Sequence, residues 1–137
     1  MHFIKLCAVG ALCQLAATSG PAQQLTLACK GTTTEYGTQG AFDPQPVSMG
    51  IVVNLINRTV QGFDYPFDLD PLEIGYVNDA TIRFAGNQET SAKSIIVGSI
   101  NRVTGDMDAT WSFIDEKHNL KTHMTYALQC KPAQRMF

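Results

Sequence analysis

The chain has 137 residues, a formal net charge of −2 at pH 7, and 45% hydrophobic against 16% charged residues. This length suits one compact domain. The slightly acidic balance offers no basic stripe of the kind that releases phosphate counterions, so nucleic acid is excluded as an expected partner.

The first 22 residues have the order of a secretory signal peptide. A short basic start precedes the uncharged, mostly apolar run Leu6–Ala17, and small residues follow it. The run is too short to span a membrane, which takes about 20 residues. We therefore expect cleavage after residues 1–22, with Ala17 and Ser19 as alternative cleavage points. Residues 23–137 are predicted to form a single β-barrel-like domain that is periplasmic or secreted.

Two of the four cysteines, Cys29 and Cys130, lie near the two ends of the predicted mature chain. Cys29 shares one face of the first strand with Leu25 and Leu27, and Cys130 shares one face of the last strand with every second residue from Met124. Two cysteines in an exported protein most often pair. A disulfide is predicted, worth about 4–5 kcal/mol in the chain-entropy model. Two free buried thiols are the alternative.

The first predicted strand covers Leu25–Thr34. The stretch Glu35–Val47 is rich in Gly and Pro and predicts a loop, which as the longest irregular segment is a candidate binding or lid loop. Met49–Ile56 alternates between apolar and other residues and predicts a strand, which turns at Asn57-Arg58 and returns over Thr59–Phe63. Its apolar face is Met49, Ile51, Val53 and Leu55.

The middle of the chain continues the pattern of short alternating segments between Gly-, Pro- and Asn-bearing turns. No segment has a helical period. The predicted segments are, in order, the loop Asp64–Pro71, a strand through Tyr76, a turn at Asn78-Asp79, a return strand through Phe84 and the polar loop Gly86–Ser91.

The stretch Ser94–Phe113 is the clearest β-hairpin of the chain, with a turn at Arg102–Gly105. A further turn at Asp115–Asn119 leads into the last strand, Lys121–Cys130, which Pro132 ends because proline donates no ladder hydrogen bond. On the second arm of the hairpin one face carries Met107, Ala109, Trp111 and Phe113, and the other carries Asp108, Thr110 and Ser112.

A weak internal repeat relates three of the predicted turns. Asn57, Asn78 and Asn101 all lie at turns and are 21 and 23 positions apart. Asparagine suits such positions because it tolerates positive φ and bonds to its own backbone. Two strands per repeat predict an all-β fold, an antiparallel up-and-down meander of about eight strands. The meander forms a small barrel or a flattened sandwich, and a disulfide between the terminal strands favours closure.

Residues that carry chemistry do not gather in a recognisable motif. His118 lies in a turn and His123 is predicted to face outward, and no HxH, HExxH or paired CxxC spacing is present. The acidic loop around Asp64 lacks regular calcium-ligand spacing. Asp115, Glu116 and His118 lie in a turn, where charged residues are expected in any case. We predict no metal, no cofactor and no catalytic residue, and we do not expect an enzyme.

The aromatic residues offer two candidate binding regions. Those on predicted inward faces either fill the barrel or line a pocket for an apolar ligand. Those in or beside loops either form a patch for a partner protein or plug the barrel mouth. The candidate ligand-binding residues are Trp111, Tyr126, Tyr76 and Phe84, and the candidate partner-binding loop residues are Phe42, Tyr65 and Phe67.

Three short stretches carry a resemblance: LACKG around Cys29, YALQCKPAQRMF around Cys130, and INRVTG between them. With these the chain resembles small uncharacterised exported β-proteins of proteobacteria, which implies export but no activity. It is also loosely similar to the periplasmic inhibitors of C-type lysozyme, small disulfide-bearing β-barrels with a cysteine in an early strand. Their Ser-Gly-x-x-Tyr type of loop is missing here, so this similarity implies architecture only.

These observations predict an exported non-catalytic protein that binds a small apolar ligand or a component of the cell envelope. The alternative is a protein-binding module, such as a periplasmic enzyme inhibitor, that presents the loops Glu35–Val47 and Asp64–Pro71. A hydrolase is the third hypothesis. A cavity lined by Trp111 and Tyr126 would favour the first hypothesis, and a filled interior with exposed loop aromatics would favour the second.

Overall fold

The structure is a computed structural model that describes residues 24–90 and 92–133. The predicted signal peptide, residues 1–22, lies outside the described residues. Within them the chain forms nine β-strands and no helix, as the alternating apolar pattern predicts. The strands are β1 (Gln24–Gly37), β2 (Gly40–Ala41), β3 (Gln45–Asn54), β4 (Thr59–Gln61), β5 (Leu72–Val77), β6 (Thr81–Glu89), β7 (Lys93–Asn101), β8 (Asp106–Ile114) and β9 (Leu120–Pro132).

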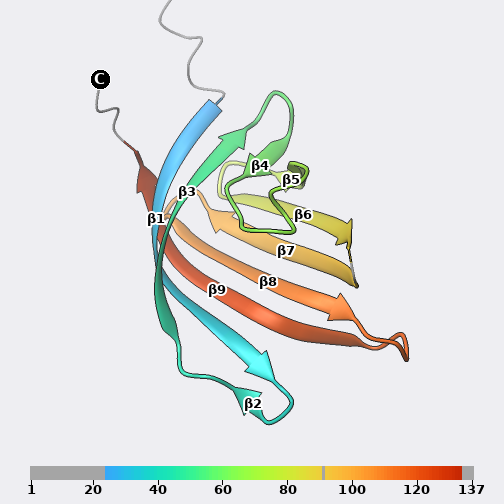
Figure 1. Cartoon of the computed structure of the whole chain (residues 1–137). Helices are drawn as coiled ribbons and strands as arrows, with labels where there is room; N and C mark the ends of the chain where they lie inside the picture. Colours follow the sequence, from blue (N-terminus) through green and yellow to red (C-terminus); the bar gives the residue numbers. More distant parts are fainter. Residues whose placement is uncertain (1–23, 91, 134–137) are drawn as a thin grey trace, which may run out of the picture.

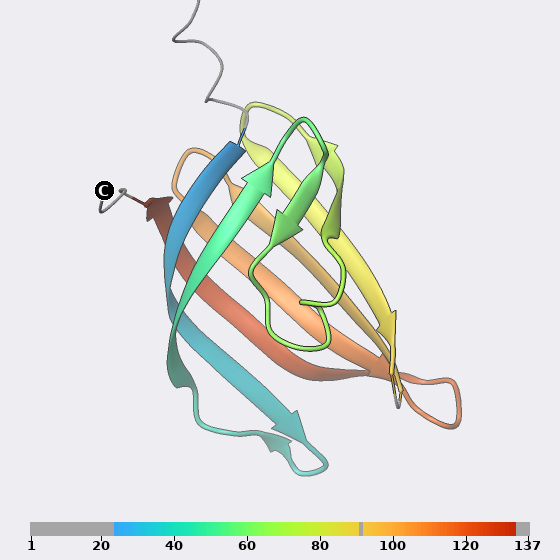
Figure 2. The same cartoon turned by 45° about the horizontal axis from the view of Figure 1, so that its top comes forward.

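The strands form one antiparallel meander that closes on itself. Their spatial order is β2-β1-β3-β4-β5-β6-β7-β8-β9, and β1 also pairs with β9. Figures 1 and 2 show the resulting barrel, with β1 and β9 side by side. The two-residue strand β2 only extends the end of β1, so eight strands make the wall. The predicted all-β meander is confirmed, and of the two predicted architectures the barrel is correct.

β1 closes the barrel because it pairs along both of its edges. Residues 24–33 pair with β3, and residues 27–35 pair with β9 without a register shift. Cys29 lies directly opposite Cys130, and the two form a disulfide with a Cα–Cα distance of 4.0 Å. Both cysteines are buried. The predicted disulfide is confirmed, and the alternative of two free thiols is wrong.

The double substitution Cys29→Ala and Cys130→Ala is expected to lower the free energy of unfolding by about 4 kcal/mol. The bond joins residues 101 positions apart, and in the chain-entropy model a ring of that size stabilises a fold by roughly 4–5 kcal/mol. Urea unfolding followed by tryptophan fluorescence measures the loss. Chemically reduced wild-type protein is the control and should match the double variant. An oxidised wild type no more stable than the variant would contradict this role of the disulfide.

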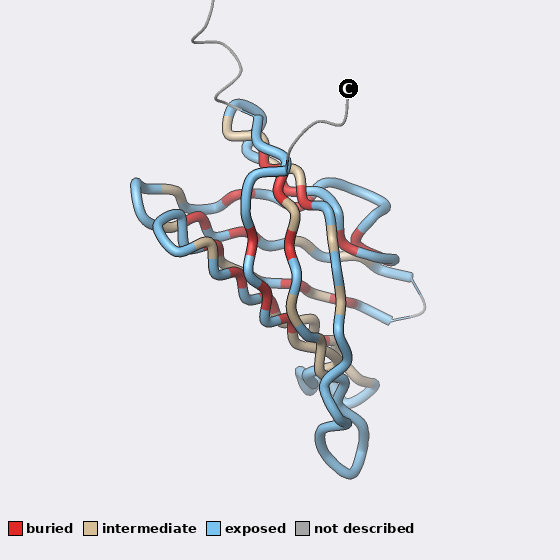
Figure 3. Tube along the Cα trace, turned by 90° about the vertical axis from the view of Figure 1, so that its left-hand side faces the viewer, coloured by how far each residue is buried: buried red, intermediate tan, exposed pale blue. Residues whose placement is uncertain are grey.

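The core is built from one face of each strand. Buried and exposed residues alternate along the strands in Figure 3, as expected for a sheet that packs on one side only. On β7, Ile96 and Ile100 are 0% and 4% exposed. Between them, Gly98 leaves room for the ring of Phe84, because a Cβ at this position would overlap the ring and lie 2.8 Å from the carbonyl oxygen of Asp108.

Gly98→Ala is expected to lower the free energy of unfolding by about 1–3 kcal/mol, because it overpacks a filled core. Gly50→Ala is the matched control. Gly50 is also a strand glycine, but a Cβ there would meet no atom within 4 Å, so alanine should leave stability unchanged or raise it by about 0.5 kcal/mol. Urea unfolding of both variants measures the difference. Equal losses would show that Gly98 is not needed for packing.

One side of the barrel wall is incomplete. β4 has three residues and joins β5 through two residue pairs, and the loop 62–71 lies across this open side in Figures 1 and 2. The loop buries Phe63 and Phe67. Phe63 meets the ring of Tyr126 edge-on at 5.3 Å between centroids, and Phe67 meets Trp111 edge-on at 5.4 Å. Aromatic side chains therefore fill this part of the interior.

Two of the predicted loops contain strand instead. Within the predicted loop Glu35–Val47, β1 continues to Gly37 and β3 begins at Gln45. Within the predicted loop Gly86–Ser91, β6 continues to Glu89, which pairs with the start of β7. Both stretches are largely exposed and polar. Such strand ends have the composition of a loop, and only pairing with a neighbour distinguishes them.

Three hairpin turns use the same asparagine hydrogen bonds, but the first uses a different residue from the one predicted. The side-chain oxygens of Asn78 and Asn101 each accept bonds from the backbone N–H groups two and three residues ahead. At the β3–β4 turn the acceptor is Asn54, and Asn57 is one of the donors. The positive φ at that turn belongs to Arg58. The hydrogen bonds that their side-chain oxygens accept, rather than their tolerance of positive φ, thus explain why asparagine occurs at these three turns.

Candidate functional site

Because the strands alternate in direction, the β3–β4, β5–β6 and β7–β8 turns lie at one end of the barrel, together with the start of β1 and the end of β9. We call this the turn end. A cavity of about 280 Å³ opens there, and we call it the mouth. Its lining is Leu25, Leu27, Val53, Leu55, Ile82, Ile100, Asn101, Arg102, Gly105, Cys130, Lys131 and Pro132.

The mouth has an aliphatic floor and a partly exposed aliphatic rim. Four floor residues from β1, β3, β6 and β7 are at most 7% exposed. At the rim Leu25 is 45% exposed and Leu55 is half-buried. At the tips of neighbouring turns Ile56 and Val103 are also exposed. Apolar surface thus continues from the core out to solvent at this end of the barrel. The floor residues are Leu27, Val53, Ile82 and Ile100.

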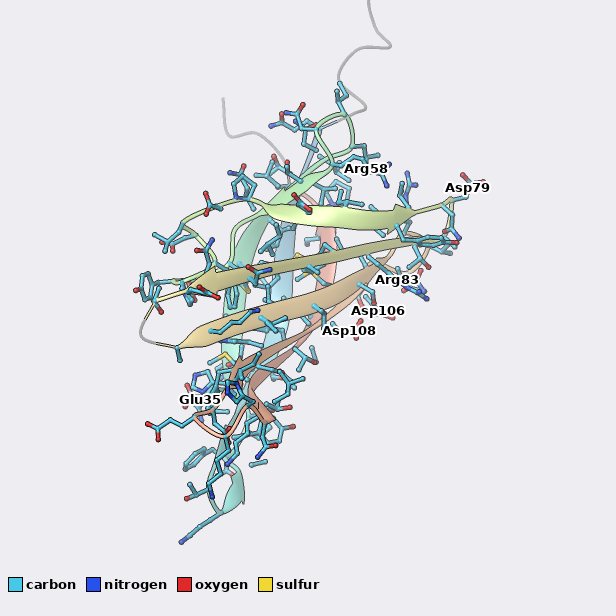
Figure 4. All side chains as sticks on the ribbon, turned by 90° about the vertical axis from the view of Figure 1, so that its right-hand side faces the viewer. Glu35, Arg58, Asp79, Arg83, Asp106 and Asp108 are labelled. Carbon is cyan, nitrogen blue, oxygen red and sulfur yellow. A yellow bond between two sulfur atoms is a disulfide. The ribbon has the colours of Figure 1, made fainter. Side chains whose placement is uncertain are left out.

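The charged residues that line the mouth are both basic. Arg102 and Lys131 are exposed, and the guanidinium of Arg102 donates a hydrogen bond of 2.6 Å to the backbone oxygen of Asn78. Within the described ranges neither cation forms an ion pair. Two acids also belong to the turn end. Figure 4 shows Asp79 at the outer tip of the β5–β6 turn, and Asp106 accepts a hydrogen bond from the hydroxyl of Thr104. Neither acid lines the mouth.

Three of the four predicted ligand-binding residues lie on the inner side of the barrel wall. Tyr126 and Phe84 are buried, and Trp111 is half-buried beneath the loop 62–71. Phe63 packs against both buried rings, at centroid distances of 5.3 and 5.7 Å. Neither Trp111 nor Tyr126 lines the mouth. Of the two roles predicted for these aromatics, the packing supports filling of the interior.

Tyr76 is predicted to face inward, and this is wrong. The β5–β6 register shifts between Ile74 and Tyr76, so that Gly75 is an extra residue in β5. Such a bulge turns the following side chain to the other face. Tyr76 is 47% exposed, with Arg83 over its ring at 5.4 Å and its hydroxyl accepting a bond from Asn78.

A second register shift changes the surroundings of Trp111. Trp111 lies opposite Met124 and Ser112 opposite Thr122, so that His123 has no residue opposite it. Ser112 is buried, although the β7–β8 register has no shift and Ser112 keeps the outward face that it shares with Thr110. His123, predicted to face outward, lies half-buried against Trp111, with 4.4 Å between ring centroids. The correction at His123 follows from the pairing of two strands, which the pattern of one strand does not contain.

The three predicted partner-binding aromatics lie in different environments. Phe42 is 63% exposed beside β2, which projects beyond the barrel in Figure 1, and Tyr65 is 60% exposed in the loop 62–71. Both connections lie at the end opposite the turn end. Phe67 is 3% exposed, so its predicted place in an exposed patch is wrong. It packs on Trp111 to cover the open side of the wall.

A larger hollow of about 750 Å³ lies over the outer face of β5, β6 and β7. Its lining mixes acids and bases, with Asp70 and Glu73 near β5 and Arg83 and Lys93 on β6 and β7. Asp70 already accepts a hydrogen bond from Gln88. The hollow is shallow and its charges have both signs, so it indicates no class of ligand.

The Asp115–Asn119 turn, which also contains Glu116 and His118, is held together by the carboxylate of Asp115. Asp115 accepts hydrogen bonds from the backbone N–H groups of Asn119 and Lys117 and lies 3.6 Å from the ammonium of Lys121. The bond from Asn119 is the main cause that lowers the pKa of Asp115 below its ordinary value. Its carboxylate therefore closes the turn, and His118 there adopts positive φ.

Burial raises the pKa of Tyr126 to about 12, and the negative charge of Asp64 contributes. Above the ordinary value of 10.0 the unfolded chain loses this proton while the folded chain keeps it. Protonated Tyr126 therefore contributes its full share to the free energy of unfolding below about pH 10, and this contribution is lost as the pH rises through about 12.

An ultraviolet absorbance titration is expected to show one of the four tyrosines ionising near pH 12. Tyr126→Phe should remove that step, and Asp64→Asn should lower its midpoint while leaving the step in place. Urea unfolding of wild type between about pH 10 and 12 should show falling stability, with a smaller fall in Tyr126→Phe. A complete tyrosine titration centred on the ordinary value would contradict the burial of Tyr126.

The described residues contain no cluster of three or more His, Cys, Asp or Glu side chains arranged to hold a metal ion. In residues 24–90 and 92–133 there is also no helix with the length and apolar character to cross a membrane. Comparison with known proteins found no match to a family model, to a curated protein or to a solved structure.

Sequence reasoning missed the mouth. Its aliphatic residues come from four strands and the β3–β4 turn, and each appears in the sequence as an ordinary core position. One signal was present: the predicted meander brings the start of the first strand to the same end as the Asn54, Asn78 and Asn101 turns. The residues next to those turns, such as Leu55 and Ile100, are the ones that line this end.

Proposed function

We propose that the chain is an exported, non-catalytic protein that binds a small apolar ligand at the mouth. The observation that carries this proposal is the mouth itself, an aliphatic cavity at the turn end whose rim residues Leu25 and Leu55 stay partly exposed. Concave apolar sites with few polar groups are typical of small-molecule binding. The disulfide and the absence of a spanning helix in the described residues are compatible with export.

The size of the mouth limits the ligand. Its volume of about 280 Å³ lies just below the roughly 300–1,000 Å³ of sites for drug-sized molecules. A single alkyl chain of modest length suits this volume, and its outer part would lie against Leu25 and Leu55. The four floor residues are all aliphatic, so burial of apolar surface would supply the affinity.

Decan-1-ol is an uncharged probe of this proposal. Wild-type protein is expected to bind it in isothermal titration calorimetry, with a negative heat-capacity change from apolar burial. Leu25→Gln should weaken binding about tenfold, because it removes apolar contact at the rim. Phe42→Gln, an exposed apolar residue at the opposite end, is the matched control and should bind as wild type does. No binding by wild type, or equal losses in both variants, would overturn the proposal.

A second candidate function is a protein-binding module, such as an inhibitor of a periplasmic enzyme. The filled interior and the exposure of Phe42 and Tyr65 favour it. Exposed aromatics are enriched where binding energy concentrates in protein interfaces. Native mass spectrometry of protein purified from the cells that make it distinguishes the two functions. A retained small molecule supports the mouth, whereas a retained protein that Phe42→Gln loses and Leu25→Gln keeps supports the module.

A further inference from the structure

We infer that the ligand of the mouth is an amphiphile with one apolar chain and one anionic group, and that Arg102 and Lys131 bind the anionic group. This inference rests on the proposed function. Of the residues that line the cavity, two are charged, and both are cations. They come from neighbouring elements, one from the β7–β8 turn and one from the end of β9, and the backbone N–H of Cys130 donates to the carbonyl of Gly105 in that turn.

The surroundings of Arg102 orient its guanidinium group. One of its nitrogens donates to the backbone oxygen of Asn78, and the backbone N–H of Arg102 donates to the carbonyl of Ala80 at 2.7 Å. These two bonds tie the β7–β8 turn to the β5–β6 turn. A guanidinium group has five N–H donors, so after the bond to Asn78 it has donors left for a carboxylate or phosphate.

Lys131 is placed by the closure of the barrel. It lies opposite Ala28 in the β1–β9 ladder, one residue after Cys130. Its ammonium group has three donors and is exposed. In the described part of the chain no carboxylate lies within 4 Å of either cation. Because Cys130 faces the core, the side chain of Lys131 leaves the wall on the outer face, and its flexible stem brings the ammonium group to the rim. An anion at the rim would meet two cations that form no ion pair among the described residues.

The chemistry of floor and rim together specifies one kind of occupant. A purely apolar molecule would leave the cations unused, and a purely polar anion would leave the partly exposed aliphatic rim, including Leu25, in water. A chain with a terminal carboxylate or phosphate matches both, because the chain removes apolar surface from water and the head forms charge-assisted hydrogen bonds. The outer hollow lacks this combination, since acids as well as bases line it.

The test compares decanoate with decan-1-ol, both below the concentrations at which they form micelles, by isothermal titration calorimetry near neutral pH. Decanoate is expected to bind wild type about tenfold more tightly than the alcohol, and the preference should shrink at high salt. In the Arg102→Gln/Lys131→Gln double variant the preference should disappear, while the alcohol binds as before. The matched control, Arg83→Gln/Lys93→Gln, removes two cations from the outer face and should keep the preference.

The outcomes separate this inference from the proposed function. If both probes bind wild type equally, the head-group site is wrong and the apolar mouth stands. If neither probe binds, both are wrong. Analytical ultracentrifugation identifies one cause of such a failure, because a dimer that excludes the probes would place a second copy in the mouth. Binding by a variant that ends at Ala133, but not by the full chain, would place the chain's own last residues there. Either result overturns the inference.

Discussion

The pairing of β1 with β9 is the constraint on which the rest of the structure depends. A meander with one apolar face buries that face only by curling, and an uncurled sheet would expose two long edges. Here β1 pairs along both edges, and the Cys29–Cys130 bond joins the first strand to the last from inside the core. The same pairing brings Leu25 and Lys131 to one end of the barrel, so closure also forms the mouth.

Extensive strand pairing on one side of the barrel accompanies sparse pairing on another. The β1–β9 ladder is long, whereas β4 and β5 share two residue pairs. The loop 62–71 compensates by placing Phe63 and Phe67 inside. Those rings pack edge-on against Tyr126 and Trp111. In the described residues no aromatic side chain lines the cavity at the turn end, and its aliphatic rim is partly exposed.

How much of this fold the sequence predicts depends on whether a feature belongs to one strand or to two. Period-two alternation correctly placed the inner faces of β3 and β9, the hairpin of β7 and β8, and both cysteines. It failed at Tyr76 and His123, because each lies at a register shift, and a shift is a relation between neighbouring strands. The prediction that Phe67 is exposed was also wrong, because the composition of a loop does not reveal that the loop folds inward. The mouth was missed for a similar reason, since its residues meet only after closure.

The shape of the mouth also determines where selectivity arises. A filled barrel offers only a shallow apolar cavity, and apolar burial discriminates weakly between chains that differ by a methylene group. Polar groups at the rim discriminate better, because a mismatched head group leaves charges partly desolvated without a partner. In this protein those groups are held by the turns and by closure, through the bond from Arg102 to Asn78 and the pairing of Lys131 with Ala28. For the proposed amphiphile, recognition at this end would therefore depend on the head group more than on the length of the chain.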